Sequence, residues 1–193
     1  MQNMMEHRKL DDQELLHLAI EASEKQRHGD AIEYLKQAIE KSASNFNAHY
    51  LLAAEHAQIG MTDRAIEEFR TALKLQPNLP AARFQLGLLF LCNGRVQEAL
   101  DAWKPLEKAG AADPYAVFAG GLTKLARDEF EACVRDLKRG MELNNANAAL
   151  NIDMKRVLEQ VEAHIAGGNP PQQPGGQEQP GQILLSAYTK TLN

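Results

Sequence analysis

A repeat at a fixed spacing constrains this chain more than any other feature of its sequence. Four small residues stand 34 positions apart, at Ala31, Ala65, Ala99 and Cys133. A large apolar residue follows each of them four positions later, at Leu35, Phe69, Trp103 and Leu137. A pair of apolar or small residues precedes each of them by twelve and thirteen positions, at Leu18-Ala19, Leu52-Ala53, Leu86-Gly87 and Gly120-Gly121. These three kinds of position recur together at the same spacing four times, which predicts four copies of one structural unit.

Each copy is expected to fold as two short helices. In the second copy Leu52 and His56 have helical spacing, Gly60 is expected to end that helix, and Thr62 is expected to cap the next one. Small residues let two helices approach closely, and large residues fill the space beside the contact. Pro105 stands inside the second helix of the third copy and removes a backbone donor, so it is expected to kink or shorten that helix.

The pattern resembles the tetratricopeptide repeat, whose signature is W-x2-L-G-x2-Y, then A-x3-F, then P. The second copy matches it with Leu52, Ala53, Ala65, Phe69 and Pro77, and the third with Leu86, Gly87, Phe90, Ala99 and Trp103. The resemblance implies an all-α fold, a right-handed solenoid of helical hairpins. Its domain would span residues 12–166, with repeats at about 12–45, 46–79, 80–113 and 114–147 and a capping helix at 148–166.

The regions outside the repeats differ in composition. Residues 1–11 form an N-terminal extension. Nine of the sixteen residues of 167–182 are Gly or Pro, which predicts a disordered linker. Residues 183–193 are apolar again and form a C-terminal tail, which is too short to be stably helical alone in water.

One side of each first helix is the candidate binding surface. The second, fifth, ninth and twelfth places of a copy share that side, because they are spaced by three, four and three. In the resembled family this side lines a concave groove that binds peptides or helices. The candidate groove residues are Leu16, Ile20, Tyr50, Ala54, Phe84, Leu88, Leu91, Tyr115, Phe118 and Leu122. The helix at 84–92 is apolar nearly all round and must be covered. Either a ligand covers it, which is the interpretation we favour, or neighbouring helices of a curved array do.

The tail is a candidate occupant of this groove, in its own subunit or in a neighbour's. Its docking residues would be Ile183, Leu184, Leu185, Tyr188 and Leu192. A flexible linker of sixteen residues spans roughly 20–24 Å root mean square, so docking is within its reach. The alternatives are a short motif that binds another protein and an end that binds nothing.

The sequence holds few groups that could carry other chemistry. His49 and His56 lack further ligands at metal-binding spacing, and Cys92 and Cys133 are expected to be inert, so we expect no metal, no cofactor and no catalytic residue. The net charge of −5 argues against nucleic acid as a partner. No stretch is long and apolar enough to span a membrane, and the start lacks a signal region, so the cytoplasm is the expected location.

These observations favour a non-enzymatic adaptor that binds an amphipathic helix or peptide of a partner protein. One alternative is a small secretion or assembly chaperone that shields apolar segments of a client. Another is a structural protein that forms homo-oligomers by tail exchange.

Overall fold

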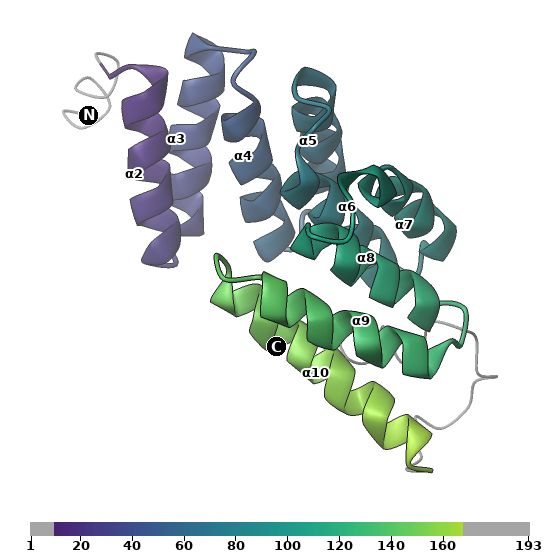
Figure 1. The fold of residues 1–193 in the computed structure, drawn as a ribbon. Helices are drawn as coiled ribbons and strands as arrows, with labels where there is room; N and C mark the ends of the chain where they lie inside the picture. Colours follow the sequence, from purple (N-terminus) through teal and green to yellow (C-terminus); the bar gives the residue numbers. More distant parts are fainter. Residues whose placement is uncertain (1–9, 168–193) are drawn as a thin grey trace. The chain divides into compact units, whose positions relative to one another are not determined.

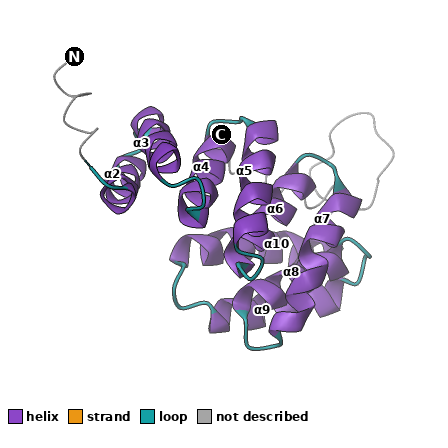
Figure 2. Ribbon diagram, turned by 90° about the horizontal axis from the view of Figure 1, so that it is seen from above, coloured by secondary structure: helices purple, strands orange, loops and turns teal. Residues whose placement is uncertain are grey.

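The structure of the chain is a computed structural model, which describes residues 10–167. Over these residues it is all-α, with nine α-helices, one 3-10 helix and no strand (Figures 1 and 2). The first helices of the four repeats are α2 (Asp12–Glu24), α4 (Phe46–Gln58), α6 (Pro80–Cys92) and α8 (Pro114–Leu125). The second helices are α3 (His28–Lys41), α5 (Thr62–Leu75), α7 (Val96–Trp103) with η1 (Lys104–Ala109), and α9 (Phe130–Leu143). The final helix is α10 (Ala148–Ile165). The expected all-α class and the pairing of helices are confirmed.

The chain divides into two compact units, with the boundary between Ala82 and Arg83 in the first turn of α6. We call residues 10–82 unit 1 and residues 83–167 unit 2. In unit 1, α2 packs against α3, α3 against α4, and α4 against α5. Its core includes Leu15, Leu16, Ala19, Leu35, Ala38, Ala48 and Leu52.

The small residues of the repeat register lie where the paired helices meet. Ala31, Ala65, Ala99 and Cys133 are all 0% exposed, and the large residue four positions after each is at most 2% exposed. A small side chain at a helix contact lets the two backbones approach, and the neighbouring large side chain then fills the space beside it. The register read from the sequence is therefore the register of the helix contacts.

Two glycines of unit 2 make room for aromatic rings. A Cβ atom on Gly87 would overlap the Trp103 indole, whose Nε1 donates a hydrogen bond of 3.0 Å to the Phe84 carbonyl. A Cβ atom on Gly140 would lie 2.5 Å from the Phe118 ring. Close contact of ring and backbone at these two points depends on the absence of a side chain.

Pro105 shortens the second helix of the third repeat, as expected. α7 has 8 residues, whereas α3, α5 and α9 each have 14. After Trp103 the chain continues as η1, with Pro105 near its start. A proline ring cannot donate to the α-helical ladder and clashes with the preceding turn, so the helix changes type at this point.

Helix starts and hairpin turns also recur with the period of the repeat. Three of the first helices, α2, α4 and α8, and the final helix α10 are each capped by an Asp or Asn side chain, at Asp11, Asn45, Asp113 and Asn147. Positive φ recurs in the turn of each hairpin, at Gln26, Gly60, Gly94 and Asp128. α10 thus starts in the register of a fifth first helix, and it packs against α9. The expected cap at Thr62 is wrong: Thr62 is the first residue of α5, and the N-cap residue Met61 makes no side-chain capping bond.

Replacing Gly87 by alanine should destabilise unit 2 by about 1–3 kcal/mol, because the added methyl group displaces the Trp103 ring from a packed core. Gly120→Ala is the matched control. A Cβ atom there would meet only the Asp136 carboxylate, at 3.3 Å, and alanine favours the helix by up to about 1 kcal/mol. Urea unfolding followed by the fluorescence of Trp103 measures both. Equal stability of the two variants would contradict the assignment of Gly87 to a steric role.

Candidate functional site

The candidate groove residues of unit 1 differ in accessibility. Leu16 is 6% exposed and belongs to the core, whereas Ile20 on the same helix is 42% exposed. Tyr50 and Ala54 on α4 are partly buried, and the Tyr50 ring lies 6.1 Å from that of Phe69. Apolar surface therefore reaches solvent on this side of unit 1, with Ile20 as its most exposed large side chain.

Two side-chain hydrogen bonds connect α2 to the next first helix, α4, and fix their relative register. Near the start of the helices, Asn45 Nδ2 donates to Asp12 Oδ2 at 2.8 Å. Near their ends, Ser23 Oγ donates to Glu55 Oε1 at 2.5 Å. Ile20 and Ala54 both occupy the ninth place of their repeats, between these two bonds. The face of unit 1 therefore combines side chains of two repeats in a defined register.

Glu55 is a buried carboxylate with two partners. It is 5% exposed, accepts the hydrogen bond from Ser23, and lies 2.8 Å from His28 Nδ1 at the start of α3. A buried carboxylate is stable only when its oxygens are hydrogen-bonded. Glu55 thus joins three helices, α2, α3 and α4, through one side chain.

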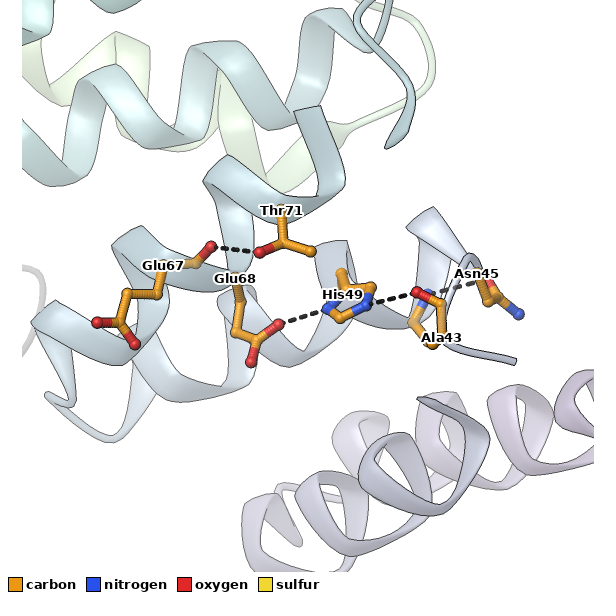
Figure 3. A network of polar contacts seen from close by, with 7 residues as sticks. Ala43, Asn45, His49, Glu67, Glu68 and Thr71 are labelled. Carbon is orange, nitrogen blue, oxygen red and sulfur yellow. Dashed lines mark hydrogen bonds and ion pairs between the residues drawn. The ribbon is translucent and has the colours of Figure 1, made fainter. Parts of the chain in front are cut away.

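His49 performs a similar role between α4 and α5 (Figure 3). Its Nδ1 atom lies 2.6 Å from Glu68 Oε2 on α5, and its Nε2 atom lies 3.2 Å from the carbonyl oxygen of Ala43. Asn45, in the same segment as Ala43, accepts from the backbone N–H of Ala48 and caps α4. Both nitrogens of the ring face oxygen atoms, so His49 holds the loop before α4 onto the helix pair.

The candidate groove residues of unit 2 are mostly buried. Phe84 and Phe118 are 0% exposed, Leu122 1%, Leu91 2% and Leu88 6%, and Tyr115 is partly exposed. The Phe84 ring has its centroid 6.0 Å from that of Trp103, 5.7 Å from Tyr115 and 6.1 Å from Phe118. Side chains from α7 and α8 therefore cover Phe84 within unit 2. The role of this set as ligand anchors stays a prediction.

The predicted tail and the docking residues Ile183, Leu184, Leu185, Tyr188 and Leu192 lie outside the described residues.

A hollow of about 580 Å³ lies in unit 2, with residues of α7 and η1 lining one side and residues of α8 the other. Its walls include Leu100, Leu106, Ala116, Ala119 and Gly120, with Lys104, Glu107, Lys124 and Arg127 also lining it. Lys124 forms an ion pair with Asp136, at 2.5 Å. The charges of both signs around this hollow define no single ligand chemistry.

Chemically reactive groups are scarce in the part of the chain that the structure describes. Burial raises the pKa of the Cys92 and Cys133 thiols to about 12 in each case. Within residues 10–167, no three His, Cys, Asp or Glu side chains are grouped to hold a metal ion.

None of the helices between residues 10 and 167 is both long enough and apolar enough to cross a lipid bilayer.

Sequence reasoning missed Glu55 as a buried polar residue, whereas His56 was noted for its place in the repeat. Both are at most 5% exposed. The repeat signature has an aromatic residue at the eleventh place of a copy. In the second copy His56 occupies that place, and Glu55 comes directly before it. A histidine at an aromatic place was the available signal for a buried ring, whereas nothing in the spacing indicated that Ser23 and His28 would reach Glu55.

The comparisons with known proteins agree with this architecture. A family model of the tetratricopeptide repeat matches residues 16–80 and 55–116, which together make up more than half of the chain. The chain therefore belongs to the tetratricopeptide repeat family. Repeats of this family mediate protein–protein interactions and are typically non-catalytic.

Two curated relatives match only part of the chain. Small glutamine-rich tetratricopeptide repeat-containing protein 2 of Mycosarcoma maydis is 34% identical over 87 residues, which are 45% of this chain and 24% of that protein. DnaJ homolog subfamily C member 3 of Rattus norvegicus is 29% identical over 84 residues, which are 44% of this chain and 17% of that protein. The match thus spans about a quarter or less of the length of these relatives.

Solved structures share the fold at low sequence identity. TTC0263, a thermophilic protein of this class from Thermus thermophilus, has a TM-score of 0.64 and 18% identity over 94% of this chain and 90% of its own. A structure of MamA has a TM-score of 0.61 and 21% identity, covering 74% of this chain and 83% of its own. YrrB, described as having an unusual peptide-binding site, has a TM-score of 0.59 and 15% identity, covering 99% of this chain and 90% of its own.

Replacing Glu55 by alanine should destabilise unit 1 by about 1–3 kcal/mol, because Ser23 loses its acceptor and His28 its carboxylate partner. Glu21→Ala is the control, since Glu21 makes an exposed ion pair with Lys25 at 3.4 Å, and its loss should change stability by less than about 1 kcal/mol. Urea unfolding followed by circular dichroism measures both variants. Similar effects of the two changes would show that the Glu55 contacts do not stabilise the unit.

Both cysteine thiols should react slowly with a disulfide reagent in the folded protein. A pKa of about 12 leaves roughly one thiolate in 10⁴ at about pH 8, and the thiolate is the reactive form. The same reagent in urea should titrate both residues quickly. Labelling of the folded protein at the rate of a free thiol would contradict this expectation, and a Cys92→Ser variant would show which residue had reacted.

Proposed function

We propose that this protein is a non-enzymatic adaptor that binds an apolar segment of a partner protein on the exposed side of its first helices. The exposure of Ile20 carries the proposal. A large aliphatic side chain that is 42% exposed on the family's ligand-binding side gives a ligand apolar area to bury. Tyr50 and Ala54, on the next first helix, would extend the contact, and the hydrogen bonds at Asp12 and Glu55 hold the two helices ready for it.

The chemistry of this side of unit 1 narrows the class of ligand. The second, fifth, ninth and twelfth places of the two repeats carry no residue that is charged at neutral pH, being Gln13, Leu16, Ile20, Ser23, Asn47, Tyr50, Ala54 and Ala57. A segment rich in charge would lose hydration here without gaining an ion pair. The family's other known mode, a clamp of Lys and Asn side chains on a terminal carboxylate, has no residues to form it at the fifth and ninth places. The favoured ligand is therefore uncharged and apolar along one side.

In unit 2 the accessible candidate is Tyr115. Phe84 would act indirectly, because its ring packs against that of Tyr115 at 5.7 Å. The other predicted residues of unit 2 are buried, namely Leu88, Leu91, Phe118 and Leu122. Their burial by the chain's own helices removes the need for a ligand to cover them.

The chain's own tail has the chemistry that this surface favours. Residues 183–193 contain four large aliphatic residues, one tyrosine and a single charged side chain, Lys190. A tether supplies a high effective concentration, so even weak docking would be populated. Docking in the same subunit would make the surface self-occupied, and docking in a neighbour would make homo-oligomers.

Ile20→Glu should weaken binding of apolar peptides by about tenfold or more, because it removes a buried apolar contact and places an unpaired charge in the interface. The probes are twelve-residue peptides selected from a random library against the full chain, and a labelled peptide of residues 182–193. Fluorescence anisotropy gives their affinities. Selected peptides should be apolar and nearly uncharged.

Ile59→Glu is the matched control. Ile59 is the same residue type, is 41% exposed and lies in the same unit, but it is the C-cap residue of α4 and occupies none of the second, fifth, ninth and twelfth places of its repeat. If Ile20→Glu and Ile59→Glu leave the peptide affinity equally unchanged, or reduce it equally, the placement of the site at Ile20 is overturned. Failure of the 182–193 peptide to bind, with other peptides binding normally, would reject only the tail as ligand.

A further inference from the structure

His56 is a buried histidine whose ring atoms are left without polar partners. It lies on α4 and is 3% exposed. Neither Nδ1 nor Nε2 has a hydrogen-bond partner among the described residues. A neutral imidazole with two unpaired nitrogens already lowers the stability of a packed core, and a charged imidazole would lower it far more.

The charges that act on His56 come from the helices on either side of α4. Glu68 and Arg64 belong to α5, and Lys36 belongs to α3. Glu68 favours the charged ring, but its carboxylate is already 2.6 Å from His49 Nδ1. Arg64 and Lys36 both disfavour the charged ring. Loss of hydration in the core is the largest effect, and together these effects hold the pKa of His56 below its ordinary value of 6.5.

The direction of the resulting pH dependence follows from proton linkage. In the unfolded chain the ring takes up a proton as the pH falls through about 6.5, whereas in the folded unit it takes up that proton only at a lower pH. Between these two pH values the unfolded state binds more protons than the folded state. His56 therefore does not reduce the free energy of unfolding above about pH 6.5, and this free energy decreases as the pH falls below that value.

Two other histidines of unit 1 have carboxylate partners. His28 Nδ1 lies 2.8 Å from Glu55 Oε2, and His49 Nδ1 lies 2.6 Å from Glu68 Oε2. His17 is exposed on α2. In unit 2 the described histidine is His164, near the end of α10 with its ring centroid 4.6 Å from that of Phe130, and it is not buried. The one described histidine that is both buried and unpartnered is thus in unit 1.

We propose that His56 makes unit 1 an acid-labile part of this protein, so that mildly acidic conditions open the first two repeats before the last two. Opening would separate α2 from α4 and release any ligand held by Ile20 and Tyr50, a consequence that rests on the proposed function. The loss of stability itself needs no ligand.

Urea unfolding of the full chain at about pH 7.5 and about pH 5.5 tests the proposal. Trp103 is the single tryptophan of the chain and lies in unit 2, so its fluorescence reports that unit, whereas circular dichroism reports all helices. At the lower pH, helix should be lost at urea concentrations that leave the fluorescence of Trp103 unchanged. The unfolding constant of this early phase should rise by up to about tenfold relative to the higher pH.

His56→Phe should abolish that rise, because phenylalanine fills the same aromatic place without a proton to bind, and His17→Asn, at an exposed position of α2, should preserve it. If His56→Phe fails to fold, two other measurements test the proposal. One is the acid response of His56→Leu, and the other is the NMR titration of the His56 ring in the natural protein. A His56 signal that titrates near its ordinary value in the folded protein overturns the proposal, and so does an acid response that His56→Phe leaves unchanged. Peptide affinity at about pH 7.5 is independent of this result, so failure of the proposed function would be recognised separately.

Discussion

The close approach of two helices at a small residue is the contact from which the remaining structure follows. Ala31, Ala65, Ala99 and Cys133 are completely buried at the same place of four successive hairpins. With little side-chain volume between them, the helices come near enough for the large residue one turn later to be enclosed as well. Because one such crossing occurs in every repeat, the caps at Asp11 and Asn45 and the turns at Gly60 and Gly94 recur at the same interval.

Departures from the repeat are compensated within the same hairpin. The third repeat has Trp103 where the second has Phe69, and the larger ring fits because the first helix carries Gly87 where the second repeat has Ala53. Phe118 likewise lies over Gly140. Pro105 is not compensated in this way: the helix changes to η1, and a hollow lies between that segment and α8. Side-chain volume can be exchanged across a helix contact, whereas a missing backbone donor cannot be supplied by a neighbour.

The sequence could predict those structural features that are determined by residues close together in the chain. The helix pairs and the effect of Pro105 follow from residues a few positions apart, and both were predictable. Burial of the candidate groove was not, because the cover of Phe84 comes from Trp103, Tyr115 and Phe118, which lie on later helices of the chain. Periodicity places these side chains on a face but does not say which face of another helix meets it. For the same reason the sequence showed a histidine at an aromatic place without showing that His56 would lack partners.

The polar contacts inside unit 1 bear on how a ligand would act. In unit 2 the rings of Phe84, Trp103 and Phe118 are enclosed together. In unit 1 the paired carboxylates of Glu55 and Glu68 stabilise the helix contacts, while the unpaired ring of His56 weakens the same core. A ligand that binds only the folded form of this unit stabilises it by mass action, in proportion to RT ln(1 + [L]/Kd). Ile20 and Tyr50 lie on two helices that hydrogen bonds at Asp12 and Glu55 connect, so a ligand bound there as proposed would be coupled to these polar contacts. Binding and folding of the first two repeats are therefore expected to be coupled, with the proton on His56 acting against both.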